Sequence, residues 1–387
     1  MRVVVLGCGF GGVEVARTLR ARSKELEIVM IDRKTRFDYQ PAYPELLSGK
    51  VTPGAISRDL TAFARKLHAE FIPAEVLGVD FAAKAVKLKV NNQSAASTTT
   101  RPRKEAEVQA ITYDFLVLAI GAEQTFFNIP GAAEHSCSIN TLSAALETRK
   151  ALEDLDHSRS RESTIPVIGA GLTGVEVAGE LLDYYRARHA KARIYLVEMM
   201  PRILPAFPRE KIADYVSTYL TARGVTILTG TAVQEVGDRE VTFKDGRALP
   251  YDLLIWTAGI KPTSLLDRLD LPKVKGWVEA DSYLRVKGMS DVFAVGDSVY
   301  FEQSGLRAGQ NVEEAEEQGK AAAKNILHTL DGTALHEYRP KNTAQNPRAL
   351  ISLGSGKAVV YSGRFMTTFL AYRVKKWVER RYLRRFG

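Results

Sequence analysis

The sequence predicts an α/β fold with two similar halves, followed by an amphipathic helical tail. Three observations predict it: a G-x-G-x-x-G motif at residues 7–12, a second copy at residues 169–174, and a basic, aromatic stretch at residues 364–386. Each motif follows a short apolar run, which is typical of a strand that turns through glycines into a helix. Such a turn cradles a pyrophosphate against the helix N-terminus. Two copies therefore indicate two Rossmann-like domains that each bind a dinucleotide, and electron transfer between a nicotinamide and a flavin is the simplest use for the pair.

The residues around each motif follow the order expected of this fold. In the first half we expect a helix at residues 13–22, a strand at 27–31 that ends at Asp32, a helix at 58–68, a hairpin from 76–79 and 85–90, a loop at 91–107, a buried strand at 113–120 and a helix at 143–154. In the second half we expect a strand at 165–168, a helix to about residue 188, a strand at 192–197 that ends at Glu198, a helix at 211–222, a strand at 225–228, a hairpin from 233–236 and 240–243, and a strand at 252–257. A further strand at 291–297 and a helix at 312–330 follow.

The bulk properties narrow the location and the partners. The chain has two cysteines, Cys8 and Cys137, which excludes a disulfide framework, and its six histidines lack metal-ligand spacing, so we expect no metal site. No signal peptide precedes the first strand and no apolar run reaches the length of a membrane span, so we expect a cytoplasmic protein. The net charge of +9 indicates an acidic partner surface.

An acidic residue follows the second strand of each half. Asp32 and Glu198 lie where a carboxylate accepts hydrogen bonds from a ribose diol. A carboxylate at position 198 repels a 2′-phosphate, which favours NADH over NADPH, although Arg202 lies near enough in the sequence to weaken that preference. The simpler alternative is a strand-end acid in solvent.

Asp297 ends an apolar strand, directly after Gly296 and before the helix at 312–330. By itself it would be read as a turn aspartate. Downstream of two cradles, however, a carboxylate at this point suits a ribityl hydroxyl of a flavin. The helix N-terminus at residues 311–313 then faces the pyrimidine edge, where its dipole stabilises a reduced flavin.

Glu14 and Glu176 occupy equivalent places just inside the two helices that follow the glycine turns. Both suit the helix dipole, which is a sufficient reason for Glu14. Glu176 has, in addition, a possible role near the two redox rings. Cys8 fits a turn that requires a small residue, and Cys137 lacks a Cys-x-x-Cys partner, so we expect both thiols to be inert.

The tail predicts an amphipathic helix. Met366, Leu370, Val374, Val378 and Tyr382 recur every four residues, and from residue 373 onward seven Lys or Arg stand against one Glu. Cations beside Trp and Phe are typical of a helix that lies on an anionic lipid surface. Docking on the chain's own domain or on a dimer partner is the alternative, and nucleic acid is a weaker one because no binding module accompanies the basic arm.

Taken together, the motifs resemble the two-dinucleotide-domain flavoprotein reductases and, among them, the type II NADH:quinone oxidoreductases. The resemblance rests on residues 118–122 (LAIGA), 126–131 (FFNIPG), 256–260 (WTAGI), 295–297 (VGD) and 319–325 (GKAAAKN) and covers almost the whole chain. It implies an FAD-binding domain in two segments, 1–130 and 266–335, an NADH-binding domain at 131–265 and a membrane-association segment at 336–387. The residues expected to bind FAD are Gly7, Gly9, Phe10, Gly11, Gly12, Asp32, Arg33, Ala119, Gly121, Gly296 and Asp297. Those expected to bind NADH are Gly169, Gly171, Thr173, Gly174, Glu198, Ala258 and Gly259.

One departure from the family concerns the electron acceptor. Where the family has an Ala-Gln pair and a further glutamine at its quinone site, this chain has Val312-Glu313 and Glu317. A glutamate there either donates a proton to a reduced quinone or indicates another acceptor. The related sulfide:quinone oxidoreductases use two cysteines beside the flavin, and outside the first cradle this chain has only Cys137.

The sequence therefore predicts an NADH dehydrogenase that passes two electrons through FAD to a membrane quinone without pumping protons. Glu176, Glu313 and Glu317 are its candidate catalytic residues. We expect a peripheral, monotopic protein on the cytoplasmic face of the cell membrane, with a homodimer as one option and with no nucleic-acid partner. The alternatives are an NADH-dependent reductase of another acceptor, such as a small electron-transfer protein, and a non-enzymatic NADH-sensing flavoprotein.

Overall fold

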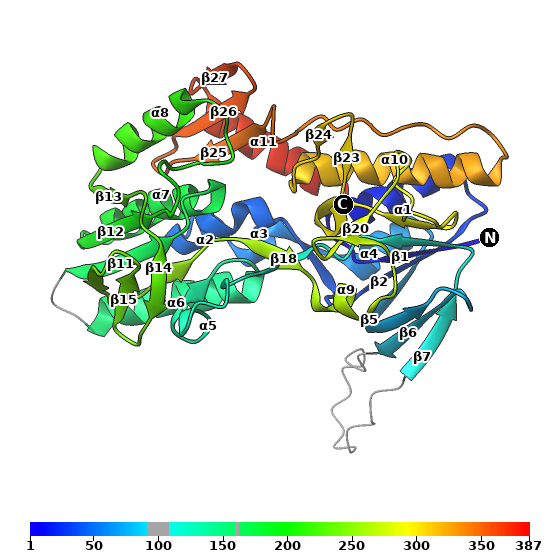
Figure 1. Ribbon diagram of the computed structural model, residues 1–387, viewed down its shortest axis with the longest axis horizontal. Coiled ribbons are helices and arrows are strands. Elements are labelled where there is room, and N and C mark those ends of the chain that lie inside the picture. Colours follow the sequence, from blue (N-terminus) through cyan, green and yellow to red (C-terminus); the bar gives the residue numbers. More distant parts are fainter. Residues whose placement is uncertain (91–107, 159–161) are drawn as a thin grey trace.

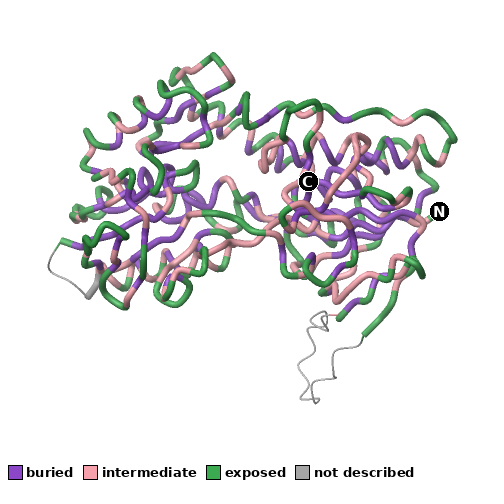
Figure 2. Tube along the Cα trace, in the orientation of Figure 1, coloured by how far each residue is buried: buried purple, intermediate pink, exposed green. Residues whose placement is uncertain are grey.

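Two sheets placed side by side organise the computed structural model, which describes residues 1–90, 108–158 and 162–387 (Figure 1). The loop expected at 91–107 lies outside the described residues. Buried residues concentrate in the two sheets and in the helix faces that cover them (Figure 2). The central strands are buried along their length because both faces of each sheet are covered, which explains their continuous apolar runs.

The first sheet has seven strands in the order β21-β8-β1-β2-β5-β6-β7. Its strands from β21 to β5 are parallel, and β5, β6 and β7 form an antiparallel meander. The strands are β1 (Arg2–Leu6), β2 (Glu27–Asp32), β5 (Glu70–Asp80), β6 (Ala85–Val90), β7 (Val108–Thr112), β8 (Phe115–Leu118) and β21 (Val292–Ala294), and the helices α1 (Phe10–Arg22) and α10 (Val312–Leu330) pack on each other beside them (Figure 1).

The second sheet has five parallel strands in the order β10-β17-β11-β12-β13. These are β10 (Cys137–Ser138), β11 (Ser163–Ile168), β12 (Ala192–Val197), β13 (Val225–Leu228) and β17 (Ile255–Trp256), with helices α6 (Leu142–Ser158), α7 (Leu172–Ala187) and α8 (Glu210–Thr221). An antiparallel sheet of β14 (Val233–Val236), β15 (Glu240–Phe243) and β16 (Ala248–Pro250) follows β13.

The chain passes between the two sheets along a pair of antiparallel strands, β9 (Ala122–Gln124) and β18 (Ile260–Pro262). These crossings lie near the boundaries expected at residues 130 and 265, and the division into domains at those residues stays an interpretation. After the second crossing the chain returns to the first sheet and adds β21 at its edge, next to β8.

The remaining elements are short. They are β3 (Arg36–Asp38), η1 (Gln40–Ala42), α2 (Tyr43–Ser48), α3 (Pro53–Ile56), β4 (Ser57–Asp59), α4 (Leu60–Lys66), α5 (Ala132–His135), α9 (Ser264–Arg268), β19 (Lys273–Val274), β20 (Trp277–Glu279), η2 (Gly296–Ser298), β22 (Val299–Tyr300), β23 (Glu302–Gln303) and β24 (Leu306–Arg307).

Several expected elements differ in length: the strand expected at 113–120 is reduced to β8, the one at 291–297 is reduced to β21, and the one at 76–79 extends to the eleven residues of β5. Two further differences have a visible local cause. The helix expected at 58–68 begins two residues later, because Asp59 caps it by accepting a 2.7 Å hydrogen bond from the Ala62 amide. The strand expected at 252–257 is reduced to Ile255–Trp256, and the Asp252 carboxylate before it accepts a hydrogen bond from the Thr164 amide at 2.8 Å.

The C-terminal region contains a sheet that the sequence did not predict. Strands β25 (Arg348–Ser352), β26 (Ala358–Ser362) and β27 (Phe365–Thr367) form an antiparallel meander before helix α11 (Ala371–Leu383). The expected helical stripe was wrong at Met366, which lies in β27. Leu370 precedes α11 and is exposed, and within the helix the stripe divides between two sides, with Tyr382 buried and Val374 exposed.

Candidate dinucleotide and electron-transfer site

The first glycine turn has the backbone that a pyrophosphate cradle requires. Gly7 has φ of +94°, and a Cβ there would overlap the Ala119 carbonyl. A Cβ on Gly12 would overlap the Gly7 carbonyl, whereas nothing lies within 4 Å of one built on Gly9. Gly9 is also the N-cap of α1 and offers no side-chain cap, so the first helical amides are free to bind an anion.

The second turn repeats this construction. Gly169 has φ of +97°, a Cβ on Gly174 would overlap the Gly169 carbonyl, and the side of Gly171 is open. Gly171 is the uncapped N-terminus of α7, and Thr173 is exposed beside it. The turn is closed from behind by Ala258, whose Cα would lie 2.8 Å from a Cβ on Gly169.

The two strand-end acids are held in the same way. Asp32 accepts hydrogen bonds from the Cys8 amide at 2.7 Å and the Lys34 amide at 2.9 Å. Glu198 accepts hydrogen bonds from the Ala170 and Met200 amides, both at 2.9 Å. Each carboxylate is thereby fixed beside its glycine turn, and its oxygens retain lone pairs for a ribose diol.

Helix α10 brings Asp297 to the first cradle because small residues allow close packing. A Cβ on Gly319 would lie 2.6 Å from the Gly11 carbonyl, and one on Gly11 would lie 3.0 Å from the Val295 side chain. The Gly296 amide donates to Gln318 Oε1 at 2.7 Å, which fixes the turn that carries Asp297. The Asn311 side chain caps α10 by accepting from the Glu314 amide at 3.0 Å.

The Asp297 carboxylate has no hydrogen-bond partner among the residues that the structure describes. Removal from water raises its pKa to about 6. A carboxylate of this kind, next to an open cradle and a helix N-terminus, fits a ligand that brings hydroxyl donors. The residues therefore suit the ribityl chain of a flavin.

Four other residues predicted to contact FAD differ from one another in burial and in the groups around them. The Ala119 amide bonds to the Leu6 carbonyl at 2.8 Å behind the turn, and Gly121 has φ of +69° with open space beside it. Arg33 is exposed at the end of β2. The Phe10 ring turns away into an aromatic cluster, 5.0 Å from the Tyr382 ring, so its backbone is the part available to a cofactor.

Glu176 lies in a buried charge cluster that the sequence did not reveal. Its carboxylate accepts hydrogen bonds from Lys375 Nζ at 2.7 Å and from the Ser352 amide at 2.8 Å. Glu45 Oε1 lies 3.3 Å from the same Lys375 nitrogen. Burial raises the pKa of Glu176, with the charge of Lys375 opposing it. For Lys375, burial opposes protonation, but the carboxylates of Glu176 and Glu45 raise the pKa above its usual value, so this lysine stays charged.

The two glutamates that depart from the family pattern are paired with cations. Glu313 Oε1 lies 2.8 Å from Arg348 Nη1. Glu317 bonds to Lys320 at 2.6 Å and also to Lys341. Burial opposes ionisation of Glu317, but these lysines lower its pKa, which disfavours it as a proton donor.

Glu314, which sequence reasoning passed over, is the buried member of the glutamate group. It accepts hydrogen bonds from the Tyr338 hydroxyl at 2.6 Å, the Lys341 amide at 2.8 Å and the Asn342 amide at 2.6 Å. It therefore ties the segment after α10 back to the start of that helix. The run of acids at residues 313–317 was the available signal, but the sequence did not show which acid faces inward.

The surroundings of the two cysteines disfavour thiol chemistry. Burial raises the pKa of the Cys8 and Cys137 thiols, which favours the less reactive protonated form. Within residues 1–90, 108–158 and 162–387, no group of three or more His, Cys, Asp or Glu side chains is arranged to hold a metal ion.

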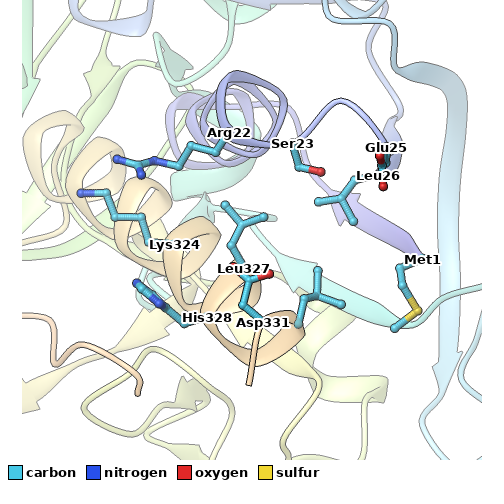
Figure 3. Close-up of a pocket in the computed structure, with 10 residues that line it drawn as sticks. Met1, Arg22, Ser23, Glu25, Leu26, Lys324, Leu327, His328 and Asp331 are labelled. Carbon is cyan, nitrogen blue, oxygen red and sulfur yellow. The ribbon is translucent and has the colours of Figure 1, made fainter. Parts of the chain in front are cut away.

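A cavity of about 530 Å³ lies apart from these groups, between the C-terminal ends of α1 and α10 (Figure 3). Arg22, Lys324, His328 and Asp331 line it, together with Met1. None of the predicted site residues contributes to its wall, so we do not assign the redox chemistry to it.

Two glycine cradles, each with a fixed acid, together with a partnerless carboxylate beside the first, define a two-dinucleotide flavoprotein oxidoreductase. The chain belongs to the pyridine nucleotide-disulphide oxidoreductase family, whose model matches residues 1–319. FAD and NADH are accordingly its cofactors.

Similar proteins cover nearly the whole chain. Demethylphylloquinone reductase NdbB of Synechocystis sp. is 28% identical, over 93% of this chain and 86% of that protein. The type II NADH:quinone oxidoreductase of Staphylococcus saprophyticus is 25% identical, over 100% of this chain and 96% of that protein. In fold, the chain resembles NDH2 of Plasmodium falciparum, solved in complex with NADH, with a TM-score of 0.84, 18% identity and coverage of 97% and 93% of the two chains.

Proposed function

We propose that this protein is an NADH:quinone oxidoreductase of the type II class, which oxidises NADH through FAD and does not pump protons. The observation that carries the proposal is the pair of matched cradles, one of which carries a partnerless carboxylate suited to a flavin. The quinone reductases among its relatives support a quinone as the acceptor.

The chain's own residues bind and orient the cofactors. Asp32 and Glu198 fix the two adenosine riboses, and the amides at the starts of α1 and α7 hold the pyrophosphates. Asp297 would accept hydrogen bonds from the ribityl chain, and the N-terminus of α10 would stabilise negative charge on the reduced flavin. FAD, when bound, supplies the two-electron chemistry. The contacts of the remaining predicted residues are part of the same proposal.

Glu176 is our candidate for handling the proton on the acceptor side. It belongs to a group of three carboxylates, Glu45, Glu176 and Glu379, and two ammonium groups, those of Lys375 and Lys376. The group therefore carries one negative charge and takes up a proton without becoming positive. The raised pKa of Glu176 makes it the better site for that proton. We place Glu313 at the edge of the acceptor site, where Arg348 neutralises it, and give Glu317 a positioning role through Lys320 and Lys341.

We propose further that α11 and the strand before it rest on an anionic lipid surface. Phe369 is 79% exposed and Trp377 is 58% exposed, and Leu370 and Val374 lie beside them. Arg373, Arg380, Arg381 and Arg384 are exposed along the same helix, and Arg381 lies 5.2 Å from the Trp377 ring. Exposed aromatics flanked by arginines suit the interface of a membrane. No helix in the described parts of the chain is long and apolar enough to cross a bilayer.

The opposite side of α11 docks on the chain itself, as the alternative interpretation expected. Lys375, Glu379 and Tyr382 are buried there, and Arg385 bonds to Glu14 at 3.1 Å and to Glu316 at 2.7 Å. The helix thus belongs both to the folded body and to the proposed membrane face. Attachment to the cytoplasmic face, and a homodimer, remain parts of the proposal.

Steady-state turnover of NADH against a panel of quinones tests the function. Turnover by the flavin-loaded protein, with bleaching of the flavin by NADH, is the expected result. A protein that is bleached by NADH but turns over with no quinone is a reductase of another acceptor, which the ion pairs of Glu313 and Glu317 would then explain. A protein that binds no flavin overturns the proposal.

A further inference from the structure

An exposed aromatic ring lies against the second cradle, in the segment that links the two sheets. The Phe127 side chain is 58% exposed. Its φ is +53°, and that of the next residue, Asn128, is +55°. Two consecutive non-glycine residues in the left-handed region are strained, and such strain persists where surrounding contacts fix the backbone, often at functional sites.

Several contacts hold this ring in place. Trp256 Nε1 donates to the Thr125 carbonyl at 3.0 Å and to the Ala258 carbonyl at 2.9 Å. The Phe127 amide donates to Thr125 Oγ1 at 3.1 Å. The Phe126 ring packs 5.7 Å from Trp256 and anchors the other side of the segment. Phe127 is therefore positioned by its neighbours without being buried by them.

The ring lies on Gly259, close to the second glycine turn. A Cβ on Gly259 would overlap the Phe127 ring, so the ring rests directly on that glycine. Gly259 adjoins Ala258, which closes the back of the turn at Gly169. These residues follow the carboxyl end of β17, and ligands of parallel sheets bind outside the carboxyl ends of the strands.

We infer that Phe127 is a wall of the NADH-binding cleft and makes an aromatic contact with the nicotinamide half of the dinucleotide. The inference rests on the proposed function and adds a positioning residue to it. Exposing an apolar ring to water is unfavourable, and the backbone at this position is strained. A planar, uncharged dihydronicotinamide would offer the ring a stacking partner that compensates for both. Loss of one aromatic contact weakens binding by about threefold to tenfold.

Two glycine substitutions separate the ring from the strain. Phe127→Gly removes both the ring and its left-handed strain, while Asn128→Gly relieves strain at the next residue and leaves the ring. The measurements are the Kd for NADH by calorimetry on flavin-loaded protein, the Tm and the flavin content. We expect Phe127→Gly to bind NADH about threefold to tenfold more weakly with Tm and flavin content retained, Phe127→Tyr to bind normally, and Asn128→Gly to bind like the unaltered protein.

An unchanged NADH Kd with a lowered Tm in Phe127→Gly would make the ring a packing residue of the linker and overturn the inference. If that variant loses its flavin, Phe127→Asn replaces it, because asparagine tolerates the left-handed backbone while lacking the ring. Failure of the proposed function looks different, since the unaltered protein would then either not bind NADH or bind it and turn over with no quinone.

Discussion

The two cradles share the construction of their ligand-facing side and differ in what packs against the helix that follows each glycine turn. On the ligand-facing side, each has a first glycine with positive φ, a second glycine with open space beside it and an acid held by backbone amides. Behind the first cradle, Phe10 meets an aromatic cluster that includes Tyr382 and Phe386 from the C-terminal end. Behind the second, Glu176 on α7 meets Lys375 from α11. The repeated motif thus encodes cofactor binding, while the tail supplies apolar packing to one half and buried charge to the other.

The largest effect on stability is expected from removing the cation that pairs with the buried Glu176. Lys375→Met leaves the buried Glu176 without its cation, while Glu45 keeps Lys376 at 3.0 Å, so the free energy of unfolding should fall by about 3–5 kcal/mol. Chemical denaturation at neutral pH measures this. Lys376→Met is the matched control: its ammonium is less buried, and Lys375 remains in place, so a smaller loss is expected.

The same variant has a predictable pH dependence. Its unpaired Glu176 carboxylate has a folded-state pKa above the unfolded value, so the protonated form favours folding and stability falls as the pH rises through the folded pKa. The deficit of Lys375→Met should therefore shrink as the pH falls from about 8 to about 5. Adding Glu176→Gln should recover part of the loss at high pH. A deficit that does not vary with pH would contradict the assigned charges.

The glycine turns test the ligand-facing side that the two cradles share. Gly12→Ala and Gly174→Ala each drive a methyl group into a backbone carbonyl and should each cost about 3 kcal/mol of stability. Gly9→Ala and Gly171→Ala meet open space, so they should leave the Tm of the ligand-free protein nearly unchanged while weakening binding of the respective dinucleotide. Equal losses of Tm at all four positions would remove the distinction between packing and ligand-facing glycines.

The first cradle differs from the second in having a carboxylate with a raised pKa, that of Asp297, beside it. Because its folded-state pKa is raised to about 6, its contribution to the stability of the flavin-free protein is largest at low pH and is lost as the pH rises through that value. Asp297→Asn should therefore stabilise the flavin-free protein by roughly 2 kcal/mol above pH 7 and leave it little changed near pH 4. It should also lower the flavin content of the purified protein, and normal flavin retention would argue against a ribityl contact.

The strand-end acids should separate the two cofactors. Glu198→Gln should raise the NADH KM about tenfold, since an ionised acceptor of a hydroxyl hydrogen bond is worth roughly 1.5 kcal/mol or more. Flavin content should stay constant. Asp32→Asn should do the reverse, with loss of flavin and, in the fraction that retains it, an unchanged NADH KM. A similar response to both substitutions would mean that the cradles are not specialised.

The smallest effect on stability is expected at the outward side of α11. Trp377→Ser and Phe369→Ser remove exposed rings, so the Tm should change by little, while partition onto anionic vesicles in a flotation assay should fall several-fold. Deleting residues 364–387 is a poorer test because it also removes the buried Tyr382 and Phe386. Vesicle binding that is unaffected by both substitutions would return α11 to a purely internal role.

Local patterns in the sequence were enough to place both cradles. The glycine turns and the acids Asp32 and Glu198 depend on residues near one another in the chain, and helix α10 has the predicted bounds 312–330. The contact between Glu176 and Lys375, by contrast, joins residues 199 positions apart, and no periodicity reveals such a pairing. The tail was ambiguous for a related reason, because its cations could bind lipid headgroups or pair with buried acids. In the structure, the cations on one side of α11 pair with acids of the same chain.

The position of Phe386 has a consequence for biosynthesis. Its ring packs 4.7 Å from Phe37 and 4.6 Å from Phe63, so the first sheet completes its core with residues that are translated much later than its first strands. The strands of the second sheet come from one continuous stretch between β10 and β17, and its helix α7 receives contacts from the C-terminal region at Ser352 and Lys375. Nascent chains should therefore acquire protease resistance in the middle before they do so at the start, the reverse of the usual N-to-C order of domain folding during translation.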